Sequence, residues 1–196
     1  MLTDKPPSTP DEILICHATE PGAPSEWVAR WLAARPAGRL LDLACGSGRH
    51  ARWAARLGHQ VLAIDRDEHA LDFLRRPADP SITVECEDLE AGPWRLCGQQ
   101  FDVIVCTNYL FRPRLALMLD LLAPHGLWIH ETFAVGNADY GRPRNPDFLL
   151  KEGELLHWAE RAGLQVIGFE CGIVERPGRA VIQRIAAVRS RQPQAL

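Results

Sequence analysis

The sequence has no run of apolar residues that approaches the ~20 residues of a membrane-spanning helix. Its start, Met1 to Lys5, does not resemble the beginning of a signal peptide. Strong charge is absent as well, because the 196 residues carry a formal net charge of -3. These absences predict a cytoplasmic protein with no membrane partner, and they make nucleic acid an unlikely partner because no basic field draws it in.

Cysteine pairs at redox or zinc spacing are also missing. The six cysteines, at positions 16, 45, 86, 97, 106 and 171, include no C-x-x-C pair and lie in or beside apolar runs. In a chain without an export signal we expect them to be reduced core residues. The spacings of Cys16-His17 and of Cys86 and Cys97 match no zinc pattern, so no metal site is predicted.

The stretch from Leu40 to Asp65 contains the main sequence signal. The apolar run at 40–43 predicts a buried strand, the spacing of 49–57 predicts a helix, and the run at 61–64 predicts a second strand. Glycines interrupt the pattern between the first strand and the helix. The stretch is therefore expected to form a β-α-β unit.

Gly46, Gly48 and Asp65 give this unit a binding chemistry. The glycines have no side chain to keep a ligand away from the backbone, and the helix N-terminus presents free N–H groups. Asp65 follows the second strand at the same edge of the sheet, where a carboxylate accepts hydrogen bonds from both hydroxyls of a ribose. The unit therefore predicts binding of a nucleoside-containing ligand.

Two classes of ligand fit these residues. Gly46 to Ala51 satisfies the G-x-G-x-x-G/A pattern, with Asp65 at about the usual ~20 residues, which allows an NAD(P)-binding oxidoreductase or sensor domain. Asp42 favours a ligand that carries an amino acid, because its carboxylate would bind an ammonium group. Two further features favour this amino-acid-bearing ligand over NAD(P): the acidic pair Glu87-Asp88, and the absence of a separate substrate domain after the sheet.

Further patterns complete the expected fold. Strands are predicted at 82–84, 101–106, 127–130, 164–174 and 180–188. Helices are predicted at 26–34, 67–75 and 151–162, and a further helix includes Leu115, Leu119 and Leu122. Ser25 is the expected N-cap of the first of these helices. The turn at 175–178 joins the last two strands as an antiparallel hairpin. We expect one α/β domain over 13–190, with a Rossmann-like, seven-stranded, mostly parallel sheet, helices on both faces and a C-terminal antiparallel hairpin. Residues 1–12, rich in Pro, Ser and Thr, are expected to be flexible.

The letters DLACGSGRH at residues 42–50 resemble motif I of the class I S-adenosylmethionine methyltransferases, and the resemblance extends over nearly the whole chain. Segments 107–113, 131–134 and 142–156 resemble a small bacterial branch similar to the tellurite-resistance methyltransferases. The resemblance implies methyl transfer from S-adenosyl-L-methionine to a small-molecule acceptor, with S-adenosyl-L-homocysteine as product. A protein or RNA acceptor is the alternative; residues 107–110 do not form the N-P-P-Y of enzymes that methylate nucleic-acid bases.

The resemblance also implies a set of cofactor contacts. Asp88 would accept a hydrogen bond from the exocyclic amine of adenine, and the Leu89 N–H would reach a ring nitrogen; alternatively, Asp88 caps the turn before Pro93-Trp94. The complete expected set is Asp42, Ala44, Cys45, Gly46, Gly48, Asp65, Arg66, Asp88, Leu89 and Thr107.

Glu131 and Tyr109 are the residues we expect to face the acceptor, because both follow strands at the carboxyl edge. A general base is needed only if the acceptor is protonated when it binds. His50 is expected to pack at the start of its helix, and His130 to point into the core, because strand alternation sends it and Glu131 to opposite faces.

The polar, Gly/Pro-rich loop at 134–147 is the candidate substrate lid, and the helix at 26–34 either packs on the sheet or covers the ligand. Predicted substrate contacts are Asn108, Arg112, Tyr140, Arg142 and Arg144. Each arginine would pair with an anionic acceptor or be an ordinary exposed side chain. Both a monomer and a homodimer are compatible with the sequence.

Overall fold

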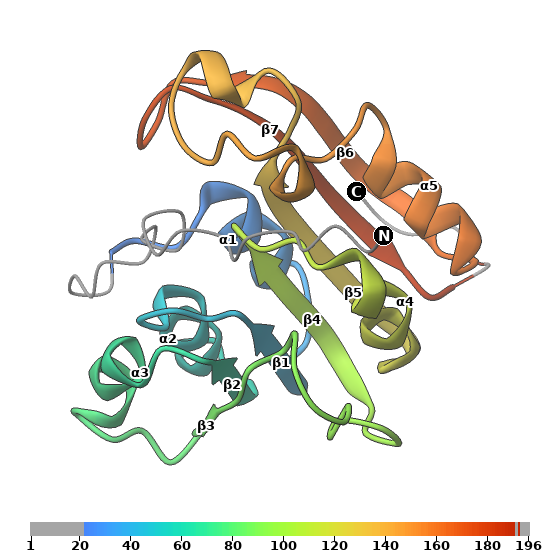
Figure 1. Cartoon of the computed structure of the whole chain (residues 1–196). Helices are drawn as coiled ribbons and strands as arrows, with labels where there is room; N and C mark the ends of the chain where they lie inside the picture. Colours follow the sequence, from blue (N-terminus) through green and yellow to red (C-terminus); the bar gives the residue numbers. More distant parts are fainter. Residues whose placement is uncertain (1–21, 191, 193–196) are drawn as a thin grey trace, which may run out of the picture.

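The computed structural model describes residues 22–190 and 192, so the predictions for residues 1–12 and for Cys16-His17 lie outside the described residues. Its core is a seven-stranded sheet in the order β3-β2-β1-β4-β5-β7-β6 (Figure 1). The strands are β1 (Arg39–Leu43), β2 (Gln60–Asp65), β3 (Ile82–Cys86), β4 (Phe101–Thr107), β5 (Leu122–Phe133), β6 (Gln165–Val174) and β7 (Ala180–Val188).

The direction of the strands matches the predicted fold class. β1 to β5 pair in parallel with their neighbours, whereas β7 is antiparallel to both β5 and β6. The mostly parallel sheet and its antiparallel hairpin are therefore confirmed. Because β7 lies between β5 and β6, the hairpin continues the sheet and does not form a separate unit.

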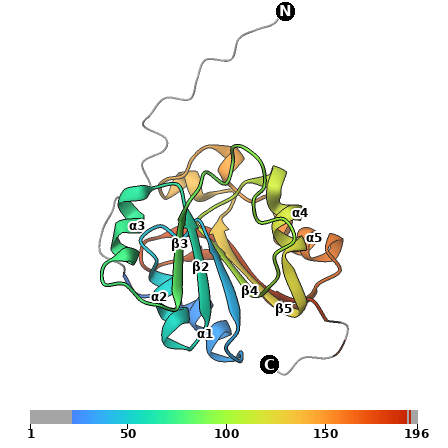
Figure 2. The same cartoon turned by 90° about the horizontal axis from the view of Figure 1, so that it is seen from below.

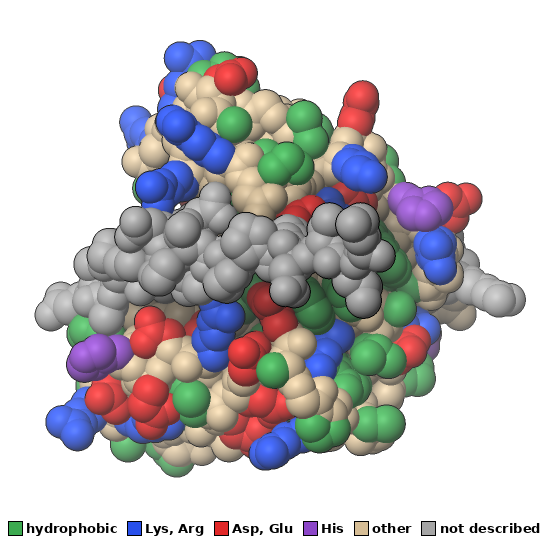
Figure 3. Space-filling model, viewed as in Figure 1, with side chains coloured by type: hydrophobic (Ala, Val, Ile, Leu, Met, Phe, Trp, Pro, Cys, Tyr) green, Lys and Arg blue, Asp and Glu red, His purple; other side chains and the backbone are tan. Residues whose placement is uncertain are grey.

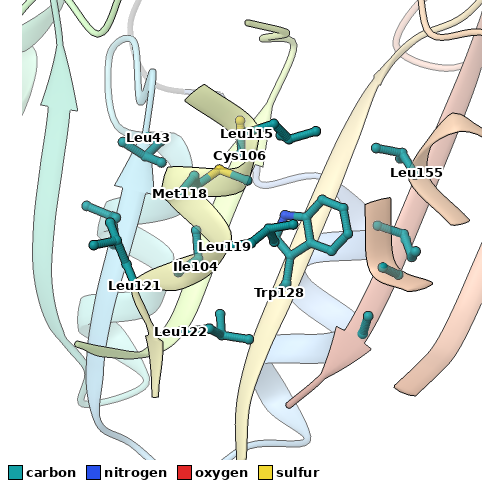
Figure 4. Packing of buried hydrophobic residues seen from close by; sticks show 14 of the residues in the cluster. Leu43, Ile104, Cys106, Leu115, Met118, Leu119, Leu121, Leu122, Trp128 and Leu155 are labelled. Carbon is teal, nitrogen blue, oxygen red and sulfur yellow. The ribbon is translucent and has the colours of Figure 1, made fainter. Parts of the chain in front are cut away.

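Within the described part of the chain, five helices cover the two faces of the sheet, as expected (Figure 2). They are α1 (Glu26–Ala33), α2 (Arg49–Arg56), α3 (Glu68–Arg75), α4 (Arg112–Asp120) and α5 (Glu154–Arg161). Apolar side chains of α1, α2 and α3 form one buried layer, and those of α4 and α5 form the layer on the opposite face. In the second layer, Leu119 and Leu155 lie near Trp128 of β5 (Figure 4).

The helix starts follow local capping chemistry. Ser25 is the N-cap of α1, and its Oγ accepts a hydrogen bond from the Val28 N–H, as predicted. Asp67 caps α3 by accepting from the N–H groups of His69 and Ala70. A side chain therefore satisfies one free N–H group in the first turn of α1 and two in that of α3.

The predicted boundaries differ most from the structure around β5, which spans Leu122–Phe133 and not 127–130, and at the start of α5. Leu122 belongs to β5 and not to the preceding helix, because α4 ends at Asp120 and Leu122 pairs with Phe101. The last helix begins at Glu154, three residues after the predicted start, because Gly153 in a left-handed conformation (φ 66°) is its N-cap.

The cysteine prediction is only partly correct. Cys45 and Cys106 are buried, as expected, but Cys86, Cys97 and Cys171 are exposed. Cys86 and Cys171 belong to β3 and β6, the two outermost strands, where side chains are less covered than in the centre of the sheet.

Within the described residues, the helices are eight or nine residues long, and none has the length and apolar character of a membrane span.

Candidate functional site

The carboxyl ends of β1, β2 and β4 lie side by side and bring the predicted cofactor residues together. Asp65 connects two of these ends, because its Oδ2 accepts from the Gly46 N–H at 2.8 Å and its Oδ1 from the Asp67 N–H at 2.9 Å. It thus holds the glycine turn after β1 against the start of α3. Each carboxylate oxygen retains acceptor capacity for a ligand hydroxyl.

The turn after β1 has three residues in the left-handed region, Ala44 (φ 54°), Gly46 (φ 55°) and Gly48 (φ 81°). A side chain on Gly46 would meet no atom within 4 Å, so its backbone faces open space. A Cβ on Gly48 would come within 2.2 Å of Leu74 Cδ2. In this structure, then, Gly46 leaves room for a ligand, while the close approach at Gly48 is with a core residue of α3.

Asp42 is a buried carboxylate beside this turn. Its side chain is 1% exposed and, although the Ala51 amide lies near it, neither oxygen has a partner at hydrogen-bonding geometry among the described residues. Burial raises the pKa of Asp42 to about 7, although the Ala51 amide and the charge of Arg49 oppose this. A cation that enters this edge would supply the partner that the carboxylate lacks.

Thr107, at the end of β4, lies against His50 of α2. His50 Nδ1 is 3.4 Å from Thr107 Oγ1, and His50 Nε2 accepts from the Ser25 N–H at 3.1 Å. Burial and the neighbouring Arg49 lower the pKa of His50 to about 3, so the ring is neutral. His50 does pack at the start of its helix, as expected, and it also connects α1 to β4.

On the other face of the sheet, an apolar hollow lies beside the loop that follows β3. It is partly open to solvent, and it is lined by Leu43, Leu89, Trp94, Cys106, Tyr109, Phe111, Arg114, Leu115, Met118 and His130. Asp88 caps the turn at its rim by accepting from the Glu90 N–H at 2.9 Å. This is the capping role considered above, and one oxygen of Asp88 is left to serve a ligand.

Tyr109 and His130 meet in the wall of this hollow. His130 Nε2 lies 3.0 Å from the Tyr109 carbonyl oxygen, which can only accept, so Nε2 donates and the lone pair resides on Nδ1. The Tyr109 hydroxyl has no described partner, and burial raises the pKa of Tyr109. His130 is completely buried, which confirms that it points into the core.

Glu131 lies on the α1 side of the sheet, away from Tyr109. Its Oε2 accepts from Ser25 Oγ at 3.1 Å and pairs with Arg184 of β7 at 3.3 Å. Arg184 also pairs with Glu170 at 2.5 Å and lies 4.9 Å from the centre of the Trp27 ring. Helix α1 is thereby held over the carboxyl end of β5 by polar and aromatic contacts.

Residues 40–126 match a family model described as a methyltransferase domain. This match covers the turn after β1 together with Asp65, Asp88 and Thr107. Residues 40–126 are therefore similar to a methyltransferase domain, and the order and direction of the strands agree with that similarity.

The chain is 32% identical over 100 residues to a ubiquinone biosynthesis O-methyltransferase of Roseobacter denitrificans. The match covers 48% of this chain and 40% of the relative, so the chain spans about two fifths of the length of that curated relative. TehB from Haemophilus influenzae has a similar fold, with a TM-score of 0.69 at 20% identity over 83% of this chain and 61% of TehB. The magnesium protoporphyrin IX methyltransferase of Synechocystis PCC 6803, solved with bound SAH, gives 0.65 at 19% identity over 83% of this chain and 80% of that enzyme.

Beside this edge of the sheet, the protein presents positive charge on the loop after β5 and on the β6–β7 hairpin (Figure 3). Arg142 and Arg144 of the loop are exposed, as are Arg176 and Arg179 of the hairpin. Arg179 lies 4.9 Å from the centre of the Tyr140 ring and so connects the two segments. Asn108 is also exposed, with a left-handed backbone (φ 54°).

Arg112 is the predicted substrate contact that makes the most internal contacts. Its guanidinium binds both carboxylate oxygens of Glu154, at 2.6 and 2.8 Å, and donates to the carbonyls of Asp147 and Leu149. These contacts hold the end of the 134–147 loop against α5. Among the described residues, its hydrogen-bonding groups are directed to the protein itself.

The 134–147 loop is anchored at its centre. Asn137 is buried, donates from Nδ2 to the Pro143 carbonyl at 3.1 Å, and accepts at Oδ1 from the Val181 N–H at 3.1 Å. Two short 3-10 turns, Asn137–Asp139 and Pro146–Phe148, lie within or beside it. The loop is thus fixed to β7 beside the candidate site.

Sequence reasoning missed the long-range partners Ser25 and Arg184. Ser25 was predicted only as a helix cap, yet it contacts a residue 25 positions away and another 106 positions away. Arg184 lies in the last strand and carried no sequence signal beyond its charge. Only the strand order, which places β7 next to β5, brings it to Glu131.

Proposed function

We propose that this methyltransferase moves a methyl group from S-adenosyl-L-methionine to a small-molecule acceptor, with S-adenosyl-L-homocysteine as product. The observation that carries the proposal is the buried Asp42 carboxylate with no partner among the described residues. The methionine group of the cofactor has an ammonium group that can bind there, whereas a nicotinamide dinucleotide has none. The chemistry of the residues therefore fits the first cofactor and not the second.

The remaining cofactor contacts follow from position. The backbone of Ala44, Cys45 and Gly46 would lie along the methionine and ribose groups, Asp65 would accept from the ribose hydroxyls, and Arg66 follows it. Asp88 and the Leu89 N–H would bind the edge of adenine, whose ring would lie at the apolar hollow.

The bound cofactor supplies a methyl group on a positively charged sulfur. The protein then has to orient the acceptor opposite that sulfur and to exclude water. We assign Glu131 to the acceptor side, because Ser25 and Arg184 fix its carboxylate at the end of β5. Tyr109 lines the hollow on the other face, so we assign it to the cofactor side of the reaction centre.

For the acceptor we propose contacts with Asn108, Tyr140, Arg142 and Arg144, on the surface beside that edge. The positive charge of the two arginines would suit an anionic acceptor. We assign Arg112 to shaping the loop, because its donors are directed to Glu154 and to two backbone carbonyls.

Calorimetric titration with S-adenosylhomocysteine, NADH and NADPH tests the cofactor. Binding of S-adenosylhomocysteine alone, weakened at least tenfold in Asp65→Asn, supports the proposal. The matched control is Asp120→Asn, an exposed carboxylate at the last residue of α4. Binding of a nicotinamide nucleotide without S-adenosylhomocysteine would refute it. Mass spectrometry of small acceptors, anions first, and of protein and RNA after incubation with the cofactor then identifies the acceptor class.

We further propose that the protein works in the cytoplasm as a monomer or a homodimer. The exposed thiols Cys86, Cys97 and Cys171, free in the structure, suit a reducing compartment. Light scattering of the purified chain distinguishes the two oligomeric states.

A further inference from the structure

Three residues from different elements form a hydrogen-bonded chain beside the proposed cofactor site. It runs from the Ser25 backbone before α1, through the ring of His50 at the start of α2, to the hydroxyl of Thr107 at the end of β4. His50 is 2% exposed and Thr107 is 7% exposed. This chain of contacts is the only link in the described structure that joins α1, α2 and β4 through polar atoms.

The direction of these hydrogen bonds is fixed by chemistry. The Ser25 N–H can only donate, so His50 Nε2 must accept and carries no proton. The ring is neutral, and its single N–H proton therefore resides on Nδ1. Nδ1 donates to Thr107 Oγ1, 3.4 Å away. The hydroxyl proton of Thr107 is then left to donate to something else, and no described residue accepts it.

The position of Thr107 in the sheet determines which acceptor its hydroxyl can reach. Asp42 of β1 pairs in register with Val105 of β4, and Thr107 lies two residues further on, so all three side chains point to the same face. At ~3.3 Å per residue, Thr107 lies about 7 Å beyond the level of Asp42. An ammonium group bound by Asp42 would carry its carboxylate, attached to the same carbon, toward Thr107.

We propose that Ser25 and His50 are positioning residues that direct the Thr107 hydroxyl proton to the carboxylate of the cofactor's methionine group. The inference rests on the proposed function. In it, hydrogen bonds through Thr107, His50 and Ser25 connect the bound cofactor to the start of α1. Ser25 Oγ also donates to Glu131, so the residue that orients the cofactor contact also fixes the acceptor-side carboxylate. Docking of α1 and binding of the amino-acid end of the cofactor are then coupled.

A pair of ligands separates this role from a general effect on structure. S-adenosylhomocysteine has the amino-acid group, and 5′-methylthioadenosine has the same adenosine and thioether without it. Calorimetry should show that Thr107→Val and His50→Leu weaken S-adenosylhomocysteine about tenfold or more, because a hydrogen bond to a charged group is lost. Binding of 5′-methylthioadenosine should change less than about twofold.

Conservative variants and a matched control complete the test. Thr107→Ser keeps the hydroxyl, and His50→Gln keeps one acceptor and one donor, so both should recover part of the lost affinity. Thr132→Val removes another buried threonine hydroxyl, on β5 and outside the chain of contacts, and should leave both ligands unaffected. Thermal unfolding of each variant shows whether it is folded.

The tautomer of His50 gives a readout that needs no ligand. Long-range ¹H–¹⁵N spectra of the protein should show a neutral ring protonated on Nδ1, assigned by its absence in His50→Gln. Protonation on Nε2, or equal losses for the two ligands in the variants, would overturn the inference. If the wild-type protein binds both ligands equally well, the amino-acid group adds no affinity; the inference is then overturned, although a site for the adenosine group remains. A wild-type protein that binds neither ligand would refute the proposed function, and the inference with it.

Discussion

At the scale of single residues, Gly46 and Gly48 have the same sequence signal but different surroundings. Gly48→Ala would place a Cβ within 2.2 Å of Leu74, so we expect a loss of about 2–4 kcal/mol in the free energy of unfolding. Gly46→Ala meets no atom and should cost only about 1 kcal/mol, from its positive φ, yet it should weaken S-adenosylhomocysteine more. Urea denaturation and calorimetry on both variants check this; equal losses of stability would contradict it.

Asp42 gives a residue-scale prediction about pH. The pKa of Asp42 is raised to about 7 in the folded protein, whereas an exposed aspartate has a pKa near 4. The folded state therefore keeps the Asp42 proton to higher pH than the unfolded state does. The contribution of this proton to the free energy of unfolding is fully present below about pH 4 and is lost as pH rises through 7.

Wild type should consequently lose stability relative to Asp42→Asn by about 1.4 kcal/mol per pH unit between pH 5 and 7. Urea denaturation of the two proteins across this range measures the difference. Saturating S-adenosylhomocysteine should reduce the pH dependence, because its ammonium group stabilises the carboxylate. Parallel pH profiles without ligand would contradict the burial argument.

At the scale of elements, Arg112 joins α4 to the segment that precedes α5. Arg112→Leu leaves the Glu154 carboxylate, of which 11% is exposed, without its guanidinium partner, and frees two backbone carbonyls. We expect a loss of about 2–3 kcal/mol and faster hydrogen exchange at residues 147–154. Arg144→Leu, an exposed arginine of the same loop, should leave stability and exchange unchanged. Normal exchange in Arg112→Leu would show that the loop does not depend on this pair.

The elements also show how far sequence reasoning reaches. The seven strands were predictable because each is an apolar run, and α1 and α3 because Ser25 and Asp67 cap them locally. Leu122 was misplaced because the helical spacing of leucines continues to two residues beyond the real end of α4. The gathering of the candidate cofactor residues at one edge of the sheet was predictable, since parallel strands end there. The pairing of Arg112 with Glu154 was not, because 42 residues separate them and local patterns carry no such information.

At the scale of the whole molecule, one sheet joins two buried layers, and each layer has its own tryptophans. Trp27 and Trp31 lie in the α1 layer, and Trp128 lies in the α4 layer. Because both layers share the sheet, unfolding by urea should be a single transition. Tryptophan fluorescence of Trp128→Phe, of a Trp27→Phe/Trp31→Phe variant, and far-UV circular dichroism should give coincident midpoints when each protein is compared with itself.

Ligand binding extends this prediction. S-adenosylhomocysteine at 100 times its Kd should raise the free energy of unfolding by about 2.7 kcal/mol in all probes alike. A transition that splits, with only the α1-layer tryptophans responding to ligand, would show that the two layers unfold independently.

The position of β7 has a consequence for how the chain is made. Ribosomes release the N-terminal part first, so β5 and β6 emerge before β7, which must lie between them. Until residues 180–188 are available, β6 has no strand to pair with and β5 has an open edge. Arg184 belongs to that late strand, so Glu131 receives this charged partner only when translation of the sheet is complete. The proposed acceptor side of the site would thus be assembled by the last of the described strands to be synthesised, and a ribosome-bound chain without it would have the carboxyl ends of β1, β2 and β4 but no Arg184 beside Glu131.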